Sequence, residues 1–174
     1  MAVRPRFRLR FTEATLPAWA ARFPADPSAT PLAGLRSRVL ARGHLARADF
    51  LALCAWKSPR AKPRCRENSE HEIRTLTHAA LTADDDSLKM DLLRLLRGVS
   101  WPTASVILHF CDRRPYPILD VRALWSLGYD KPPRYTTEFW LAYVAYTRTL
   151  VARLGVDMRT LDRALWQYSK ESQD

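Results

Sequence analysis

The residues best placed to do chemistry lie between Leu92 and Leu127, where a glycine-centred bend precedes a single aspartate. Gly98 interrupts two stretches whose apolar residues recur at helical spacing, and glycine accepts the geometry of a tight turn. Asp120 follows a short proline-containing connection and opens a third helical pattern. We interpret the stretch as a backbone clamp for a nucleic-acid strand, with a carboxylate held a fixed distance away.

The clamp hypothesis depends on how the second helix of this hairpin begins. Apolar spacing predicts that the first helix ends at Arg97, that Ser100 caps the second, and that Pro102 lies in its first turn. A connection this short places the two helices antiparallel, and the N–H groups at the start of the second helix can bind a phosphate. The predicted DNA-binding residues here are Arg97, Gly98, Val99, Ser100, Trp101 and Thr103.

The bend resembles the helix-hairpin-helix DNA-binding motif, whose turn usually reads Leu-Pro-Gly-Val-Gly. The turn here is Leu96-Arg97-Gly98-Val99-Ser100. The resemblance continues through Tyr116-Pro117-Ile118-Leu119-Asp120-Val121-Arg122, where the helix-hairpin-helix DNA glycosylase superfamily has its catalytic aspartate. It covers residues 88–128 and implies an all-α, glycosylase-like helical bundle. It also implies a monofunctional DNA glycosylase of base excision repair, acting on DNA damage or mismatches, with Asp120 as the catalytic residue.

Several positions depart from the superfamily pattern. Ser100 replaces the second glycine of the turn, and Pro102 stands where bifunctional members carry a lysine nucleophile. A Schiff-base lyase is therefore not expected, although Lys57 or Lys89 could substitute for that lysine. Three cysteines cannot hold the iron–sulfur cluster of some members. We expect no cofactor, while the resemblance allows a monovalent cation at the hairpin turn.

Asp120 suits the chemistry of base excision, because a carboxylate stabilises the positive charge that develops on the sugar and can activate water. Aspartate is also a favoured helix N-cap, and a cap needs no catalytic role. The two roles can coexist. The main alternative function is accordingly a non-enzymatic helix-hairpin-helix DNA-binding protein, and a second is a helical protein that docks on a partner protein.

A cationic stretch between residues 56 and 66 is the second candidate for DNA contact. We expect it to be a proline-stiffened loop, whose cations Lys57 and Arg60 meet phosphate while Trp56 stacks on a base. By its order in the chain, the part Trp56–Arg60 resembles the superfamily segment that lines the base pocket and fills the gap in the duplex. The candidates for the pocket or for a wedge in the duplex are Trp56, Lys57, Arg122 and Trp125. The alternative is a solvated loop whose tryptophan faces the core.

Composition limits the partner and the class of protein. The 174 residues favour one domain, and a hydrophobic fraction of 47% suffices for a core. The net charge of +10 points to a polyanion, which we take to be DNA. We expect no membrane association, a monomer, and a cytoplasmic location that would be nucleoid-associated in a bacterium. Metal binding by the run from Asp84 to Asp86 is not expected, because these residues suit helix capping.

The N-terminal segment forms a basic arm over residues 1–11. Apolar residues from Val3 to Phe11 alternate with Arg4, Arg6, Arg8 and Arg10, which predicts an extended chain with one apolar and one cationic face. The arm either lies along phosphates or docks on the domain with its arginines in solvent. The remaining helices expected are Leu16–Phe23, Leu32–Leu45, Phe50–Trp56 after an Asp49 cap, a helix capped by Ser69, Glu138–Leu154, and Met158–Tyr168 after an Asp157 cap.

Overall fold

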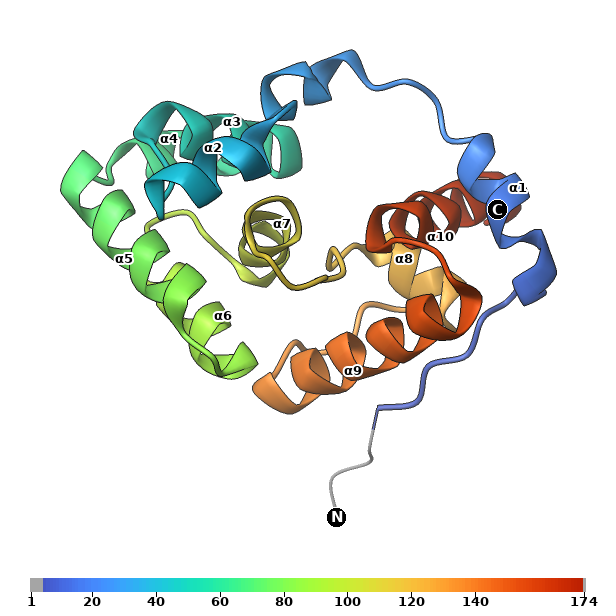
Figure 1. Ribbon diagram of the computed structural model, residues 1–174. Coiled ribbons are helices and arrows are strands. Elements are labelled where there is room, and N and C mark those ends of the chain that lie inside the picture. Colours follow the sequence, from blue (N-terminus) through green and yellow to red (C-terminus); the bar gives the residue numbers. More distant parts are fainter. Residues whose placement is uncertain (1–4, 174) are drawn as a thin grey trace. The chain divides into compact units, whose positions relative to one another are not determined.

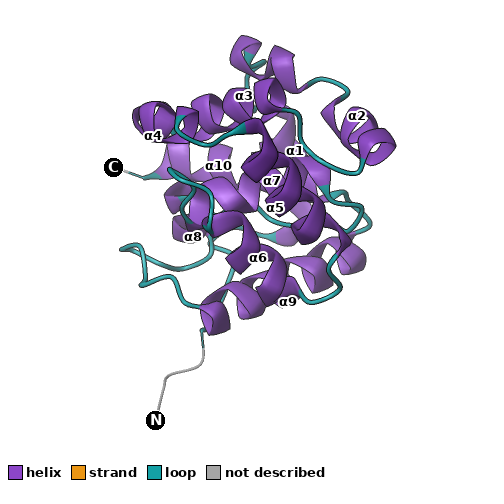
Figure 2. Ribbon diagram, turned by 90° about the vertical axis from the view of Figure 1, so that its left-hand side faces the viewer, coloured by secondary structure: helices purple, strands orange, loops and turns teal. Residues whose placement is uncertain are grey.

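Every regular element in the computed structural model is a helix (Figure 2). The structure describes residues 5–173, without the side chains of residues 27, 28 and 30. Over that part of the chain the all-α prediction is confirmed. The described chain forms two compact units, one made of the segment up to Ala25 with residues from Pro115 onward, the other of Asp26–Arg114. The single domain expected from the chain length stays a prediction.

Unit 1 is organised around its last helix. Its α-helices are α1 (Leu16–Ala21), α8 (Val121–Ser126), α9 (Thr137–Leu154) and α10 (Met158–Ser172). Helix α10 packs against α1, α8 and α9, and the α1–α10 pairing brings the first and the last α-helix of the described chain together (Figure 1). Leu161 and Leu165 bury the inner face of α10. Asp157 caps this helix through the N–H of Thr160, at 2.6 Å, as the sequence predicts.

The N-terminal arm docks on unit 1 by its apolar face. Phe7 contacts four aromatic rings, with centroid distances from 5.3 to 5.6 Å. The backbone N–H groups of Arg8 and Arg10 donate to the carbonyls of Leu127 and Ser126, at 3.0 and 2.9 Å. The predicted alternation holds for residues 5–11, where apolar side chains are half-buried and arginines exposed. Docking by the apolar face is therefore confirmed, although Arg10 contacts Asp130 and Trp125 instead of solvent alone, and contact with phosphates stays a prediction. Val3 and Arg4 lie outside the described residues.

Unit 2 surrounds one apolar helix. Its α-helices are α2 (Leu35–Arg42), α3 (Arg47–Lys57), α4 (Lys62–Arg66), α5 (Glu70–Thr82), α6 (Asp86–Arg94) and α7 (Trp101–Cys111). Helix α7 packs against α2, α3 and α6, and all its residues from Thr103 to His109 are buried. A helix that is buried on every side must be predominantly apolar, as this one is. The second helix of the predicted hairpin, α7, is therefore part of the core of unit 2.

The predictions for the cationic stretch and for Asp49 are wrong. The stretch expected to be a loop is helical, because Pro59 and Pro63 each occupy the first turn of a short helix, where proline is accommodated. The first of these is a 3₁₀ turn, η3 (Pro59–Ala61), and the second is α4. Asp49 does not cap α3, since that helix begins at Arg47 and the carboxylate of Asp49 pairs with Arg38 and Arg42 instead.

Candidate nucleic-acid interface

The bend at Gly98 lies directly against the cationic segment Lys57–Arg66. Helix α6 ends at Arg94, earlier than predicted, and Leu95–Ser100 connect it to α7. Gly98 has a φ of +80°, and a Cβ atom added there would lie 2.6 Å from Sγ of Cys65 and 2.9 Å from its backbone nitrogen. Glycine is required here both for the left-handed backbone and for the close approach. The two stretches that the sequence analysis predicted to contact DNA are therefore neighbours in unit 2.

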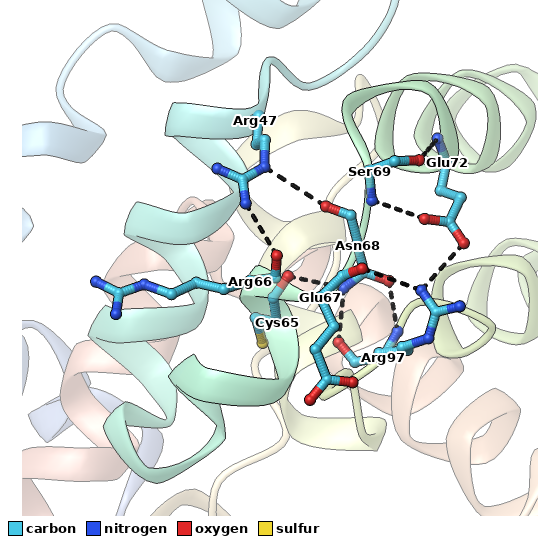
Figure 3. Close-up of polar contacts among 8 residues, drawn as sticks. All are labelled: Arg47, Cys65, Arg66, Glu67, Asn68, Ser69, Glu72 and Arg97. Atoms are coloured by element: carbon cyan, nitrogen blue, oxygen red, sulfur yellow. Dashed lines mark hydrogen bonds and ion pairs between the residues drawn. The ribbon is translucent and has the colours of Figure 1, made fainter.

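Asn68 fastens the bend to the end of α4. Its side-chain Oδ1 accepts the N–H of Arg97 at 2.8 Å, and its Nδ2 donates to the carbonyls of Arg97 and Cys65, both at 2.9 Å (Figure 3). Asn68 is only 2% exposed, so these bonds replace its contact with water. Sequence reasoning missed this residue, because no local pattern distinguishes it from a polar residue after a helix.

The guanidinium of Arg97 binds acceptors at the end of α4 and in the first turn of α5. Its Nη1 donates to the carbonyl of Glu67 at 3.2 Å and to Oε1 of Glu72 at 3.1 Å (Figure 3). Glu72 also closes the predicted capping box with Ser69. Hydrogen bonds from Ser69, with the charge of Arg97, hold the pKa of Glu72 below its usual value. Arg97 remains 49% exposed at its side chain, so it positions the bend while one side faces solvent.

Helix α7 begins with unsatisfied hydrogen-bonding groups. Ser100 occupies the N-cap position but forms no side-chain cap, so that prediction is wrong. The described chain supplies no acceptor for the N–H groups of Trp101 and Thr103, and Pro102 has no N–H. The hydroxyl of Thr103 is fully buried and has no hydrogen-bond partner among the described residues. Arg94 places its guanidinium 4.1 Å from the ring centre of Trp101.

The cationic segment beside the bend carries charge that is not neutralised. Within the described chain, no ion pair involves its four exposed cations, Arg60, Lys62, Arg64 and Arg66. Arg47 holds this segment by donating to the carbonyl of Arg66 at 2.9 Å (Figure 3). The uncapped N–H of half-buried Trp101 and the unpaired cations belong to one unit, and both kinds of group can bind phosphate.

Trp56 and Lys57, the proposed pocket or wedge residues, lie at the end of α3. The indole N–H of Trp56 donates to Oδ2 of Asp26 at 2.8 Å. The ring meets Phe110 edge to face, with centroids 5.5 Å apart. Both Trp56 and Lys57 are half-buried. The structure thus anchors Trp56 through two contacts within unit 2.

Asp120 belongs to unit 1, where it is the N-cap of α8. Its Oδ1 accepts the N–H of Arg122 at 2.9 Å, which confirms the predicted cap. Asp120 is half-buried, and the pKa of Tyr135 is raised, first by burial and then by the negative charge of Asp120. The catalytic role of Asp120 stays a prediction.

The other two pocket candidates, Arg122 and Trp125, are also on α8. The guanidinium of Arg122 lies 5.4 Å from the ring centre of Trp166. Trp125 is covered by Arg10 of the N-terminal arm, whose guanidinium lies 4.4 Å from its ring centre. The structure therefore groups Asp120, Arg122 and Trp125 in unit 1, and the bend with its cationic segment in unit 2.

Neither metal ligands nor reactive thiols are gathered in the described chain. No group of three or more histidine, cysteine or acidic side chains among residues 5–173 could hold a metal ion. All three cysteines are buried and unbridged, and burial raises the pKa of Cys54 and Cys111, which keeps these thiols protonated. Over the same residues, no helix has the length and apolar character needed to cross a bilayer.

Comparison of the chain with protein-family models, with curated proteins and with solved structures gave no match.

Proposed function

We propose that this chain binds DNA through the bend at Gly98 and the cationic segment beside it, and that it hydrolyses the N-glycosidic bond of a damaged or mismatched base. The observation that carries the proposal is the close contact between Gly98 and Cys65. That contact puts the uncapped start of α7 and an unneutralised run of arginines and lysines into one unit.

The binding half of the proposal follows from electrostatics. Backbone N–H groups at a helix start hold a phosphate by hydrogen bonds and by the helix dipole. Exposed cations such as Arg60 and Arg64 add affinity by displacing the counterions of DNA, so binding must weaken as salt rises. A net charge of +10 supports the same class of partner.

The catalytic half rests on Asp120 and on the resemblance to helix-hairpin-helix DNA glycosylases. Departure of a base leaves positive charge on the sugar, which a carboxylate stabilises while it activates water. The target base must leave the stack before this chemistry can occur. With Pro102 at the position of the lyase lysine, we expect hydrolysis without strand cleavage.

A second candidate is a DNA-binding protein with no catalytic activity. The observation that favours it is the hydrogen bond from the N–H of Arg122 to Asp120, because a capping aspartate is sufficiently explained by its helix. This candidate binds DNA through the same interface in unit 2, and it differs from the enzyme only in that Asp120 caps α8 without a catalytic role.

An incision assay separates the two candidates. Duplexes containing uracil, oxoguanine, alkylated or mismatched bases are incubated with the protein, and heated alkali then cuts any abasic site. The enzyme hypothesis predicts base release from at least one duplex, lost in Asp120→Asn, which preserves capping and DNA binding. Release from no duplex, despite DNA binding, would favour the non-enzymatic protein.

Salt dependence tests the interface itself. Arg64→Gln removes one exposed cation of the segment, and Arg113→Gln removes one elsewhere in unit 2 as a control of equal charge. We expect the slope of log affinity against log salt to fall by about 0.9 in Arg64→Gln, as for one phosphate contact, and to change little in Arg113→Gln. Wild-type protein without salt-sensitive DNA affinity would contradict the proposal and favour docking on a protein partner.

A further inference from the structure

Unit 1 has an aromatic pair surrounded by cations, made of Phe23, Arg122, Arg163, Trp166 and Lys170, which we call the α10 face. The rings of Phe23 and Trp166 meet edge to face, with centroids 5.3 Å apart. Arg122 and Lys170 place their charged groups 5.4 and 5.1 Å from the ring centre of Trp166. Arg163 lies 5.8 Å from the ring centre of Phe23. A fourth cation, Arg159, lies 5.6 Å from the ring centre of Phe23 but is paired with Asp162. Three cations outside any such pair therefore converge from two helices on one aromatic pair.

The spacing along α10 places these residues together on the side of the helix away from the core. Arg163, Trp166 and Lys170 follow one another at intervals of three and four residues, so their side chains share one face. Leu161 and Leu165 lie on the opposite face and are buried. Arg163 and Lys170 are exposed, whereas Trp166 is half-buried. Apolar spacing on α10 predicted only the buried face, which is why the sequence did not nominate this one.

The cations of the α10 face have no carboxylate partner. Other arginines of unit 1 form ion pairs, such as Arg22 with Glu171 and Arg153 with Glu13. Within residues 5–173, no ion pair involves the side chains of Arg122, Arg163 or Lys170.

One carboxylate near this face is already engaged. Asp157 caps α10 through the N–H of Thr160, which lowers its pKa, and it interacts with Arg163 only through its longer-range charge. The three cations are therefore held by aromatic rings that leave their charge uncancelled.

We propose that the α10 face is a second contact surface for DNA, binding phosphates of the backbone. A cation seated on an aromatic ring is oriented by the ring, yet keeps its hydrogen-bond donors for another partner. Arg122 adjoins Asp120, so this surface begins on the helix that the proposed catalytic residue caps. The inference rests on the proposed DNA-binding function and extends it to unit 1.

DNA suits this surface better than an anionic membrane does. Interfacial helices insert large apolar side chains beside their cations. In α10 the large aliphatic side chains are buried, and the indole of Trp166 is packed against Phe23. The surface therefore offers charge and donors with little exposed apolar area, which is the character of a phosphate contact.

The test compares three double variants of the full chain on an intact DNA duplex over a range of salt concentrations. Arg163→Gln with Lys170→Gln removes two cations of the α10 face. Lys131→Gln with Arg134→Gln removes two exposed cations from the connection between α8 and α9 and serves as the matched control. Arg163→Lys with Lys170→Arg exchanges the side chains and keeps both charges. Circular dichroism establishes that each variant is folded.

We expect the slope of log affinity against log salt to fall by about 1.8 in the neutralised α10 variant, the value for two lost phosphate contacts. The matched control and the charge-preserving variant should keep the wild-type slope. If the neutralised variant behaves like its control while wild type binds DNA, the α10 face is not a contact and the interface in unit 2 stands.

Two other outcomes would also overturn the inference. Absence of salt-sensitive DNA binding by wild type removes the proposed function together with this extension. A neutralised variant that keeps its DNA affinity but loses binding to phosphatidylserine vesicles would assign the α10 face to a membrane surface.

Discussion

Replacement of Gly98 by alanine tests the contact that brings the bend and the cationic segment together. The backbone at Gly98 is left-handed, which costs a residue with a Cβ atom about 1–2 kcal/mol. The new methyl group would also lie 2.6 Å from Sγ and 2.9 Å from the backbone nitrogen of Cys65. The second of these atoms is backbone, so α4 or the bend must move, at a further cost of about 1–3 kcal/mol. We expect Gly98→Ala to lower the free energy of unfolding by about 2–5 kcal/mol in total.

Gly34→Ala is the matched control within unit 2. Gly34 has a similar φ of +67°, and its nearest neighbour would be Nη1 of Arg38, at an ordinary contact distance of 3.5 Å. This variant carries the backbone cost alone. Urea unfolding followed by circular dichroism gives the free energy of unfolding of both, and we expect Gly98→Ala to lose about 1–3 kcal/mol more than Gly34→Ala.

The same two variants connect the packing of the bend to DNA affinity. Where both proteins are folded, displacement of the bend should weaken DNA binding in Gly98→Ala and leave Gly34→Ala near wild type. Equal loss of stability in the two variants would refute the close approach at Cys65. A destabilised Gly98→Ala protein that binds DNA as well as Gly34→Ala would refute the role of the bend in binding.

Two further predictions concern buried charge. Lys89 and Asp112 are 1% and 3% exposed and form an ion pair of 2.5 Å, so Lys89→Met should lower the free energy of unfolding by about 3 kcal/mol, and adding Asp112→Asn should recover much of it in urea titrations. A loss no larger than that of an exposed substitution would contradict this. Burial alone would raise the pKa of Asp49, but hydrogen bonds from Arg42 and Arg38 outweigh it and lower the pKa. The contribution of ionised Asp49 to the free energy of unfolding is therefore present above the unfolded pKa of about 3.9 and is lost as pH falls through the folded pKa. Asp49→Asn should lower the free energy of unfolding at pH 7 and match wild type in strong acid. An equal loss of stability at both pH values would be inconsistent with this prediction.

Sequence periodicity and capping chemistry predicted most of the helical segments. The capping box of Ser69 and the caps at Asp120 and Asp157 are all present in the structure. Each of these features involves residues within one turn of each other, so the local chain suffices to specify it. The alternation around Phe7 likewise predicted which face of the arm would dock.

Local rules failed where a distant residue competed for the same group. Asp49 has good capping chemistry, yet its carboxylate pairs with Arg38 and Arg42, and α3 begins at Arg47. Pro59 and Pro63 were taken to stiffen a loop, although proline is equally suited to start a short helix. Asp49 could cap a helix or form ion pairs, and the prolines could stiffen a loop or begin a helix. The local sequence is compatible with either structure in each case, and tertiary packing decides which one forms.

The tertiary structure alone decided how the candidate sites are assembled. Gly98 contacts Cys65, and Asn68 accepts a hydrogen bond from Arg97, although these pairs are far apart in the sequence and no helical or strand periodicity predicts either contact. The α10 face likewise joins Arg122 to Trp166, from two helices far apart in the chain. Periodicity predicts which face of a helix is apolar. Only the packing of that apolar face against other helices determines which polar residues of different helices come together on the opposite, polar faces.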